Sequence, residues 1–296
     1  MRIVSLLPSA TEIAFDLGLG DDVVGVTHEC DFPAAAATKA VVSHSTLDHD
    51  GLTPAQIDAA VAGSIGAGEA IYRLDTDRFA ALQPDLILAQ DLCRVCAVPT
   101  GQVEEALETL GCTAEVISLD PARLDDVIEC TVTVGLATGT EARAERRAAE
   151  LRERVASVRA ATRDLPWPRA LALEWSDPPF TGGHWVPEMI EAAGATCLLG
   201  ESGLPSRRAS WEEIESADPG VVVFMPCGYG LDEAVAQGRE LLERPEVEAA
   251  SLLAVDASAY FSRPGPRLVD GVEALAWVLH PGAVAEPPPG RFVRLR

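Results

Sequence analysis

Residues 82–89 read LQPDLILA, and residues 217–225 read ADPGVVVFM with the same order of features. Each stretch closes a helical pattern, turns at a proline and continues as an unbroken apolar run of strand length. Such runs are typical of strands that are covered on both faces, as in parallel sheets. Because this unit occurs once in each half of the chain, it predicts two α/β lobes.

Other apolar runs of strand length surround these two units, and helical patterns separate them. We predict strands at Ile3–Leu7, Val23–Thr27, Leu86–Ala89, Val116–Leu119, Ala170–Glu174, Val221–Met225 and Leu252–Asp256. We predict one helix that begins near Ser9 and further helices at Thr76–Leu82, Val103–Leu110 and Val186–Ala193. The alternation of strands and helices favours parallel sheets in both lobes.

Residues 141–163 contain no glycine or proline, and this segment joins the two halves. Its apolar residues recur three and four positions apart and so occupy one helix face. These residues are Ala144, Ala148, Leu151, Val155 and Val158. At about 1.5 Å per residue the helix exceeds about 30 Å, which suits a rod between lobes. We therefore predict an N-terminal α/β lobe at 1–138, a long linking helix at 139–165 and a C-terminal α/β lobe at 166–296.

The composition excludes several classes of partner. The chain of 296 residues has a formal net charge of −23, which argues against nucleic acid and against anionic membrane surfaces. It contains no run of about 18 apolar residues, so we expect no membrane span. Residues 1–2 lead directly into the first predicted strand, without the pattern of a secretory signal. We therefore expect a cytosolic protein.

Aromatic residues gather where the predicted strands end. Ligands of open α/β sheets bind outside the carboxyl ends of the strands. Trp175, Trp185, Tyr229 and Tyr260 follow such ends in the second half of the chain. Aromatic side chains at these positions suit a large, flat and partly apolar ligand. The alternative is that some of them only cap the ends of the sheet.

The seven cysteines form a second pattern. Cys93 and Cys96 have the CxxC spacing of metal ligands or redox dithiols, and Cys30 and Cys227 follow strand ends in different lobes. Four thiolates could hold zinc or an iron–sulfur cluster. The alternative is four unrelated free thiols. The other cysteines lie in apolar stretches and are expected in the core: Cys112, Cys130 and Cys197.

Motifs for other chemistries are absent from the sequence. It contains no GxGxxG, no GxxxxGK[ST] and no GxSxG pattern, so nucleotide binding and serine hydrolysis have no motif support. A hydrolase or transferase on the two-lobed scaffold is therefore the weakest of the alternatives.

Several segments together resemble a known family. Residues 3–12, IVSLLPSATE, resemble the opening of the class III periplasmic substrate-binding proteins of ABC importers, which carry cobalamin, haem and iron–siderophores. The segments LGDDVVGV at 19–26, PDLI at 84–87 and AAG at 192–194 fit the same pattern. Three further segments look like a leaderless branch described as cobalamin-binding-protein-like: THECD at 27–31, QDLCRVCAV at 90–98 and GHWVPEM at 183–189.

This resemblance implies two Rossmann-like lobes joined by one rigid helix, with a corrinoid-sized ligand cleft between them. Our leading hypothesis is cytosolic, non-catalytic binding of a corrinoid such as cobalamin. The aromatic residues would pack on the macrocycle, polar residues would serve its periphery, and His28 or His184 would approach cobalt. The expected ligand-binding residues are Ser9, His28, Glu29, Tyr72, Arg73, Gln90, Asp91, Trp175, His184, Trp185, Tyr229, Tyr260 and Arg263.

Two alternatives stay open. In one, Cys30, Cys93, Cys96 and Cys227 bind an iron–sulfur cluster or another metal, and the protein is a redox component that acts on a corrinoid with a partner protein. In the other, the chain is an exported binding protein of an ABC importer whose signal has been removed. All three readings expect a small-molecule ligand and no nucleic acid.

Overall fold

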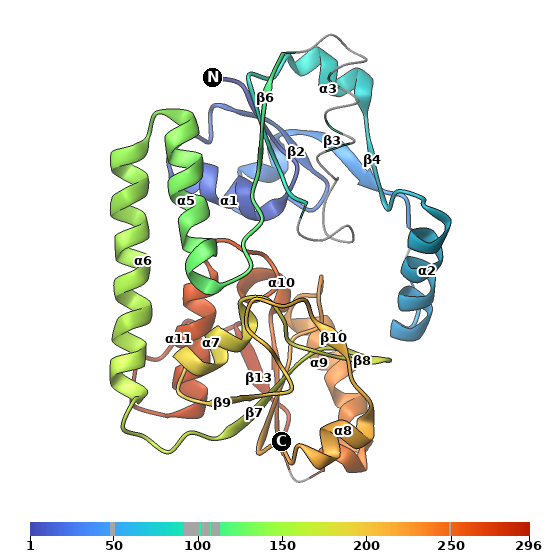
Figure 1. Cartoon of the computed structure of the whole chain (residues 1–296), viewed down its shortest axis with the longest axis vertical. Coiled ribbons are helices and arrows are strands. Elements are labelled where there is room, and N and C mark those ends of the chain that lie inside the picture. Colours follow the sequence, from blue (N-terminus) through green and yellow to red (C-terminus); the bar gives the residue numbers. More distant parts are fainter. Residues whose placement is uncertain (48–50, 92–100, 102, 104–106, 108–112, 249) are drawn as a thin grey trace. The chain divides into compact units, whose positions relative to one another are not determined.

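The computed structural model describes residues 1–47, 51–91, 101, 103, 107, 113–248 and 250–296. The chain forms two compact units, which are coloured along the sequence in Figure 1. Unit 1 comprises Met1–Asp120 and Glu129–Arg146, and unit 2 comprises Pro121–Ile128 and Arg147–Arg296. Each unit contains one sheet and is described by itself.

The sheet of unit 1 has six strands in the order β4-β3-β2-β1-β5-β6. The strands are β1 Ile3–Ser5, β2 Val23–Thr27, β3 Ala40–Ser45, β4 Tyr72–Leu74, β5 Leu86–Ala89 and β6 Glu115–Ser118. Neighbouring strands are parallel except for β4, which runs antiparallel to β3 at the edge. The carboxyl ends of β1, β2, β3, β5 and β6 therefore share one edge of the sheet.

Apolar side chains cover both faces of this sheet. Ile3, Leu86 and Leu88 belong to one core cluster, whereas Val4 and Ile87 belong to another. Successive side chains of a strand point to opposite faces, so an unbroken apolar run supplies both clusters. This double coverage explains why the central strands could be predicted from their apolar runs.

The helices of unit 1 differ in how they pack. They are α1 Pro8–Asp16, the short η1 Ala36–Thr38, α2 Pro54–Ala67 and α3 Thr76–Leu82. Most residues of α1 are buried, whereas none of α2 is, and Figure 1 shows α2 apart from the sheet. A capping box between Thr53 and Gln56 fixes the start of α2.

Helices α5 Leu124–Thr138 and α6 Glu141–Thr162 follow β6 and lie side by side in Figure 1. A Cβ atom at Gly135 would lie 2.3 Å from the Cβ of Ala144, so the absent side chain lets the two helices approach closely. Gly139 has φ +68° in the turn between them, a conformation that favours glycine. The helix predicted at 141–163 is confirmed, and the predicted lobe limits stay a prediction.

Unit 2 has a seven-stranded mixed sheet in the order β10-β8-β7-β11-β12-β13, with β9 also paired to β7. The strands are β7 Arg169–Ser176, β8 Pro179–Thr181, β9 Thr196–Leu198, β10 Arg207–Arg208, β11 Val221–Phe224, β12 Ser251–Val255 and β13 Phe292–Arg294. The centre is parallel, from β9 through β7 and β11 to β12. The antiparallel pairings involve β8, β10 and β13.

The helices of unit 2 are α7 Val186–Ala192, α8 Trp211–Ser216, α9 Leu231–Glu240, η2 Leu241–Glu243, η3 Pro245–Val247, α10 Ala257–Tyr260 and α11 Leu268–Leu279. Helix α11 packs against α7. Arg154 of α6 lies 2.5 Å from Asp270 and 2.7 Å from Glu273, which ties α6 to α11. Among the residues described, none of the helices has both the length and the apolar composition needed to cross a membrane.

The predicted strands are all present, and their ends differ from the predicted ends by at most two residues. No strand was predicted at β3, β4, β8, β9, β10 or β13, and no helix was predicted at α2, α5, α8, α9, α10 or α11. Of the helix predicted at Val103–Leu110, the structure describes only Val103 and Leu107, and both are buried. The rest of that prediction lies outside the described residues.

Candidate ligand-binding site

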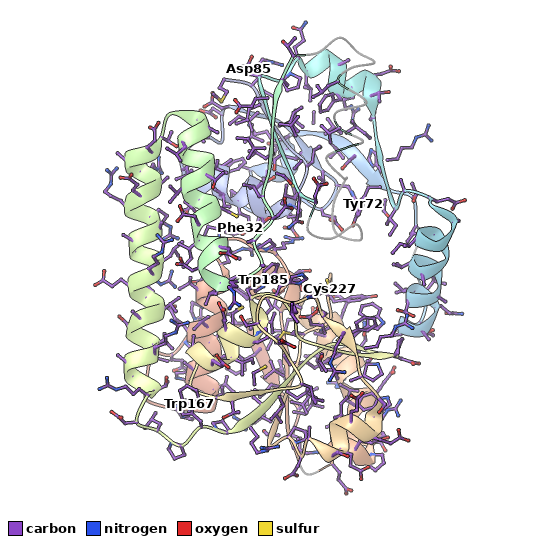
Figure 2. All side chains as sticks on the ribbon, viewed as in Figure 1. Phe32, Tyr72, Asp85, Trp167, Trp185 and Cys227 are labelled. Carbon is purple, nitrogen blue, oxygen red and sulfur yellow. The ribbon has the colours of Figure 1, made fainter. Side chains whose placement is uncertain are left out.

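The carboxyl ends of β7, β11 and β12 meet at one edge of the sheet of unit 2. Trp175 lies at the end of β7, and its ring centroid is 5.8 Å from that of Tyr229, which follows β11. The amide of Ser258, in α10 after β12, donates to the carbonyl of Tyr229 at 3.0 Å. Figure 2 shows Trp185 and Cys227 at this end of unit 2, and Trp167 at the other. The three strand ends thus form one connected surface.

Glu174 holds this edge together. Its carbonyl accepts a hydrogen bond of 3.1 Å from the amide of Cys227. Its carboxylate accepts one of 3.1 Å from the amide of Gly183 and another from the hydroxyl of Ser206. One side chain therefore connects the end of β7 with two loops that are distant in sequence. The sequence predicts Glu174 as the end of a strand and indicates no further role for it.

Steric contacts and hydrogen bonds constrain the backbone of the loop at 182–185. A Cβ atom at Gly183 would lie 2.1 Å from the amide nitrogen of Ser206, so only glycine fits there. His184 follows with φ +49°. Its amide donates to the carbonyl of Leu204 at 2.6 Å, and its carbonyl accepts from the amide of Gly203 at 2.9 Å. These contacts fix the direction in which the imidazole leaves the backbone.

Trp185 supports that imidazole. The two ring centroids are 5.6 Å apart and the planes are inclined by 29°. Trp185 is only 6% exposed, and its indole N–H donates to the carbonyl of Phe261 at 2.8 Å. Burial lowers the pKa of His184, because the charged imidazolium loses hydration there. The ring is therefore neutral near pH 7.

The aromatic pair of Trp175 and Tyr229 is half-buried. The pKa of Tyr229 is raised, mainly by burial and also by the nearby carboxylate of Glu233. A hydrogen bond with Gln237 lowers the pKa and offsets part of this rise. Tyr229 therefore stays a neutral phenol over the physiological range. The pair offers two flat apolar faces and a hydroxyl at the edge of the sheet, which suits a broad ligand.

The other predicted residues of unit 2 have different surroundings. The ring of Tyr260 lies 5.0 Å from the guanidinium carbon of Arg291 and 5.8 Å from that of Arg267. Tyr260 also lines a small apolar pocket with residues of β12 and α11. Arg263 is half-buried in the turn before α11, where its carbonyl accepts from the amide of Gly265.

In unit 1 the carboxyl edge carries an imidazole cluster. His28 is exposed just after β2, and its Nδ1 donates to the carbonyl of Ser43 at 3.2 Å. Its ring centroid is 6.1 Å from that of His44 on β3 and 6.1 Å from that of Tyr72 on β4. Arg73 is exposed on β4, opposite His44. In Figure 2 Tyr72 is labelled on this unit.

The remaining predicted residues of unit 1 offer less surface. Ser9 is 2% exposed in α1, and Gln90 is 4% exposed after β5. Glu29 is half-buried, and its amide donates to the hydroxyl of Thr27 at 3.2 Å. Asp91 is exposed, and its amide donates to Asp120 at 2.6 Å. Ligand contacts of all four residues stay predictions.

Comparison with known proteins identifies the family. The sequence matches the periplasmic binding protein family over residues 3–251. The chain belongs to that family. It is 29% identical over 287 residues to a cobalamin-binding protein of Halobacterium salinarum, which covers 94% of this chain and 69% of that protein. It is 24% identical over 289 residues to a vitamin B12-binding protein of Vibrio cholerae, covering 94% and 88% of the two chains.

Solved structures of periplasmic binding proteins have the same fold. The periplasmic vitamin B12 binding protein BtuF of Vibrio cholerae matches with a TM-score of 0.67 at 23% identity, covering 94% of this chain and 96% of that chain. A periplasmic heme binding protein from Pseudomonas aeruginosa matches with a TM-score of 0.71 at 23% identity, covering 99% and 97%. The predicted two-lobed α/β fold and the family resemblance are confirmed.

Two of the four cysteines of the proposed metal site, Cys30 and Cys227, lie within the described residues. Cys93, Cys96 and Cys112 lie outside the described residues. Cys30 is 3% exposed, with its sulfur 3.1 Å from the hydroxyl of Thr11, whereas Cys227 is exposed. Within the described part of the chain, no group of three or more His, Cys, Asp or Glu residues could hold a metal ion. The four-thiolate site stays a prediction.

The cysteines expected in the core differ from one another. Cys130 is buried in the main core cluster of unit 1, as predicted. Cys197 is half-buried on β9, and its pKa rises to about 11, mainly because burial disfavours the thiolate. The charge of Glu191 acts in the same direction.

Glu188 is an anchor that the sequence pattern does not reveal. Glu188, in the first turn of α7, accepts hydrogen bonds from Arg123 at 2.8 Å, from the amide of Leu124 at 2.9 Å and from the hydroxyl of Ser202 at 2.5 Å. It thereby fixes the start of α5 to unit 2. The available signal was one acidic residue within the apolar run Trp185–Ile190.

Proposed function

We propose that this chain binds a corrinoid of the cobalamin type. The observation that carries the proposal is the similarity to proteins named for cobalamin and vitamin B12, which extends over 94% of the chain and so includes residues of both units. The family as a whole takes different ligands, so the proposal also depends on the chemistry of the strand ends.

The aromatic edge of unit 2 supports a macrocyclic ligand. Trp175 and Tyr229 are half-buried and lie 5.8 Å apart, so each keeps part of its ring accessible for packing. A corrin ring is wide and largely apolar on its faces, with amide groups on its rim. Neutral hydrogen-bonding groups such as the Tyr229 hydroxyl suit those amides.

The charge around this edge favours a corrinoid over haem. Glu174 lies at the edge, and Glu233 is close enough to raise the pKa of Tyr229. Haem carries two carboxylates, which would meet these acidic side chains, whereas the amides of a corrinoid carry no charge. Repulsion of the wrong ligand is a usual source of specificity.

We propose binding without catalysis, since the arrangement of residues at the edge is that of a recognition surface. The carboxylate of Glu174 accepts hydrogen bonds from the amide of Gly183 and the hydroxyl of Ser206, so it joins two loops of the edge. The cytosolic location expected from the sequence stays a separate prediction.

Calorimetric titration of the reduced protein with cyanocobalamin tests the proposal. We expect saturable binding at one site with a Kd below about 10 μM, which corresponds to a binding free energy near −7 kcal/mol. Haemin, titrated in the same buffer, should bind more weakly. Absence of heat and of any change in tryptophan fluorescence with cyanocobalamin, from a protein with a cooperative unfolding transition, contradicts the proposal.

A further inference from the structure

His184 has a backbone conformation that most residues avoid. Its φ of +49° lies in the left-handed region, where a β-carbon is crowded and glycine is the usual choice. The chain nevertheless has histidine at this position, directly after two glycines. Such strain persists only where the surroundings hold it, and it is concentrated at functional sites.

The surroundings hold His184 from several sides. Hydrogen bonds to Leu204 and from Gly203 fix its own peptide groups. Glu174 fixes the preceding residue through the amide of Gly183. Trp185 stacks on the imidazole and is itself anchored through Phe261. The ring therefore has a fixed position beside the edge that carries Trp175 and Tyr229.

The ring nitrogens of His184 have no hydrogen-bond partner within the residues that the structure describes, and the side chain is half-buried. Burial lowers the pKa of the imidazole, so a lone pair is available at pH 7. A neutral imidazole with one free nitrogen is the commonest side-chain ligand for transition metals.

We propose that His184 supplies an axial nitrogen ligand to the cobalt of the bound corrinoid. This inference rests on the proposed function and specifies the ligand: a corrinoid with an exchangeable axial position, such as aquocobalamin. The bond from cobalt(III) to its axial water breaks, and a bond from cobalt to a His184 nitrogen forms. Water leaves, the other ring nitrogen keeps its proton, and no electron is transferred.

The visible absorption of bound aquocobalamin tests this inference. Coordination should move its bands to those of the same corrinoid mixed with free imidazole. His184→Asn is the informative variant, because asparagine tolerates the left-handed region and the loop keeps its backbone. His28→Ala removes the other imidazole that the sequence analysis expects near cobalt, and it tests that alternative directly. Cyanocobalamin, whose axial positions are both occupied, is the control ligand.

We expect the imidazole-type spectrum with the wild type and with His28→Ala, and an aquo-type spectrum with His184→Asn. The affinity of His184→Asn for aquocobalamin should fall by about tenfold or more. Removing a residue that only hydrogen-bonds to a metal ligand already lowers metal affinity by at least about tenfold. The affinity of His184→Asn for cyanocobalamin should stay nearly unchanged, which shows that the variant is folded.

Other results overturn the inference in distinguishable ways. An aquo-type spectrum of aquocobalamin bound to the wild type rejects coordination and leaves the proposed function intact. A shift that survives in His184→Asn, or that disappears in His28→Ala, assigns the ligand to another residue and also rejects it. Failure of the wild type to bind either corrinoid rejects both the inference and the proposed function.

Discussion

Single residues set the chemistry of the edge of unit 2, where we propose that the ligand binds. Trp175 is half-buried beside Tyr229, whereas Trp167 is 44% exposed at the other end of the unit. We predict that Trp175→Ala weakens cyanocobalamin binding by about 1–3 kcal/mol, because a large aromatic contact is lost. Trp167→Ala should change the affinity little. Calorimetric titration of both variants measures the difference, and equal losses would remove Trp175 from the site.

The thiols offer a second prediction at this scale. With a pKa of about 11, only about a thousandth of Cys197 is thiolate at pH 8, and the thiolate is the reactive form. Cys227 is exposed. Iodoacetamide at pH 8 should therefore modify Cys227 long before Cys197, as followed by mass spectrometry of peptides. The rate at Cys197 should rise steeply toward pH 11 or on unfolding. Equal rates of modification of Cys227 and Cys197 at pH 8 would contradict the burial of the Cys197 thiol.

Elements are held in place by contacts that join distant segments. Glu188 of α7 fixes the first turn of α5 through Arg123 and Leu124. Burial alone would raise the pKa of Glu188, but hydrogen bonds from Ser202, Leu124 and Arg123 lower it below 4.5. A carboxyl group whose pKa is lowered by folding stabilises the protein above the unfolded pKa, and this contribution is lost as the pH falls through the folded pKa.

We predict that Glu188→Gln destabilises the protein at pH 7 by about 1–3 kcal/mol, because charge-assisted hydrogen bonds are lost. The difference from the wild type should shrink as the pH falls through the lowered pKa of Glu188, because Glu188 itself then becomes protonated. Glu191→Gln, an exposed change in the same helix, is the control. Urea unfolding at several pH values gives these differences, and a pH-independent difference would mean that the charge of Glu188 is not involved.

Strands with unbroken apolar runs were predictable from the sequence, and short or partly polar strands were not. Strands such as β5 and β11 are apolar throughout because helices cover both faces of their sheets. By contrast, β3 contains Ser43 and His44, and β10 consists of Arg207–Arg208. Strands that are partly polar or only two residues long are fixed by pairing with a neighbour, and their own sequence gives a weak signal.

The candidate site was predictable to a similar degree. Aromatic residues after buried strands could be found because ligands gather at those ends. The role of Glu174 could not, because it depends on pairing three segments that lie far apart in sequence. The left-handed backbone of His184 was also hidden, because histidine itself gives no signal of positive φ. Tertiary hydrogen bonds impose that conformation.

At the scale of the whole molecule, the net charge of −23 should affect the binding of haemin and of cobalamin differently. Related proteins are named for each of these two macrocycles. Cyanocobalamin has no net charge, so its Kd should change by less than about twofold between about 0.02 and 0.5 M salt, since screening has nothing to act on. Haemin brings carboxylates toward an acidic chain and toward Glu174 and Glu233. Any haemin binding should therefore strengthen as salt screens the repulsion.

Parallel titrations of cyanocobalamin and haemin at several salt concentrations measure both dependences. Aggregation of haemin is monitored in buffer without protein, so that its loss from solution is not mistaken for binding. A steep dependence of cyanocobalamin affinity on salt would mean that charged groups dominate recognition, contrary to the proposed contacts with the aromatic pair and the neutral Tyr229 hydroxyl. A haemin affinity that weakens with salt would instead indicate a basic site, which the charge of the chain opposes. If an acidic protein recognises an amide-bearing macrocycle through neutral groups, the affinity for cyanocobalamin should stay constant with salt. The affinity for haemin should rise with salt.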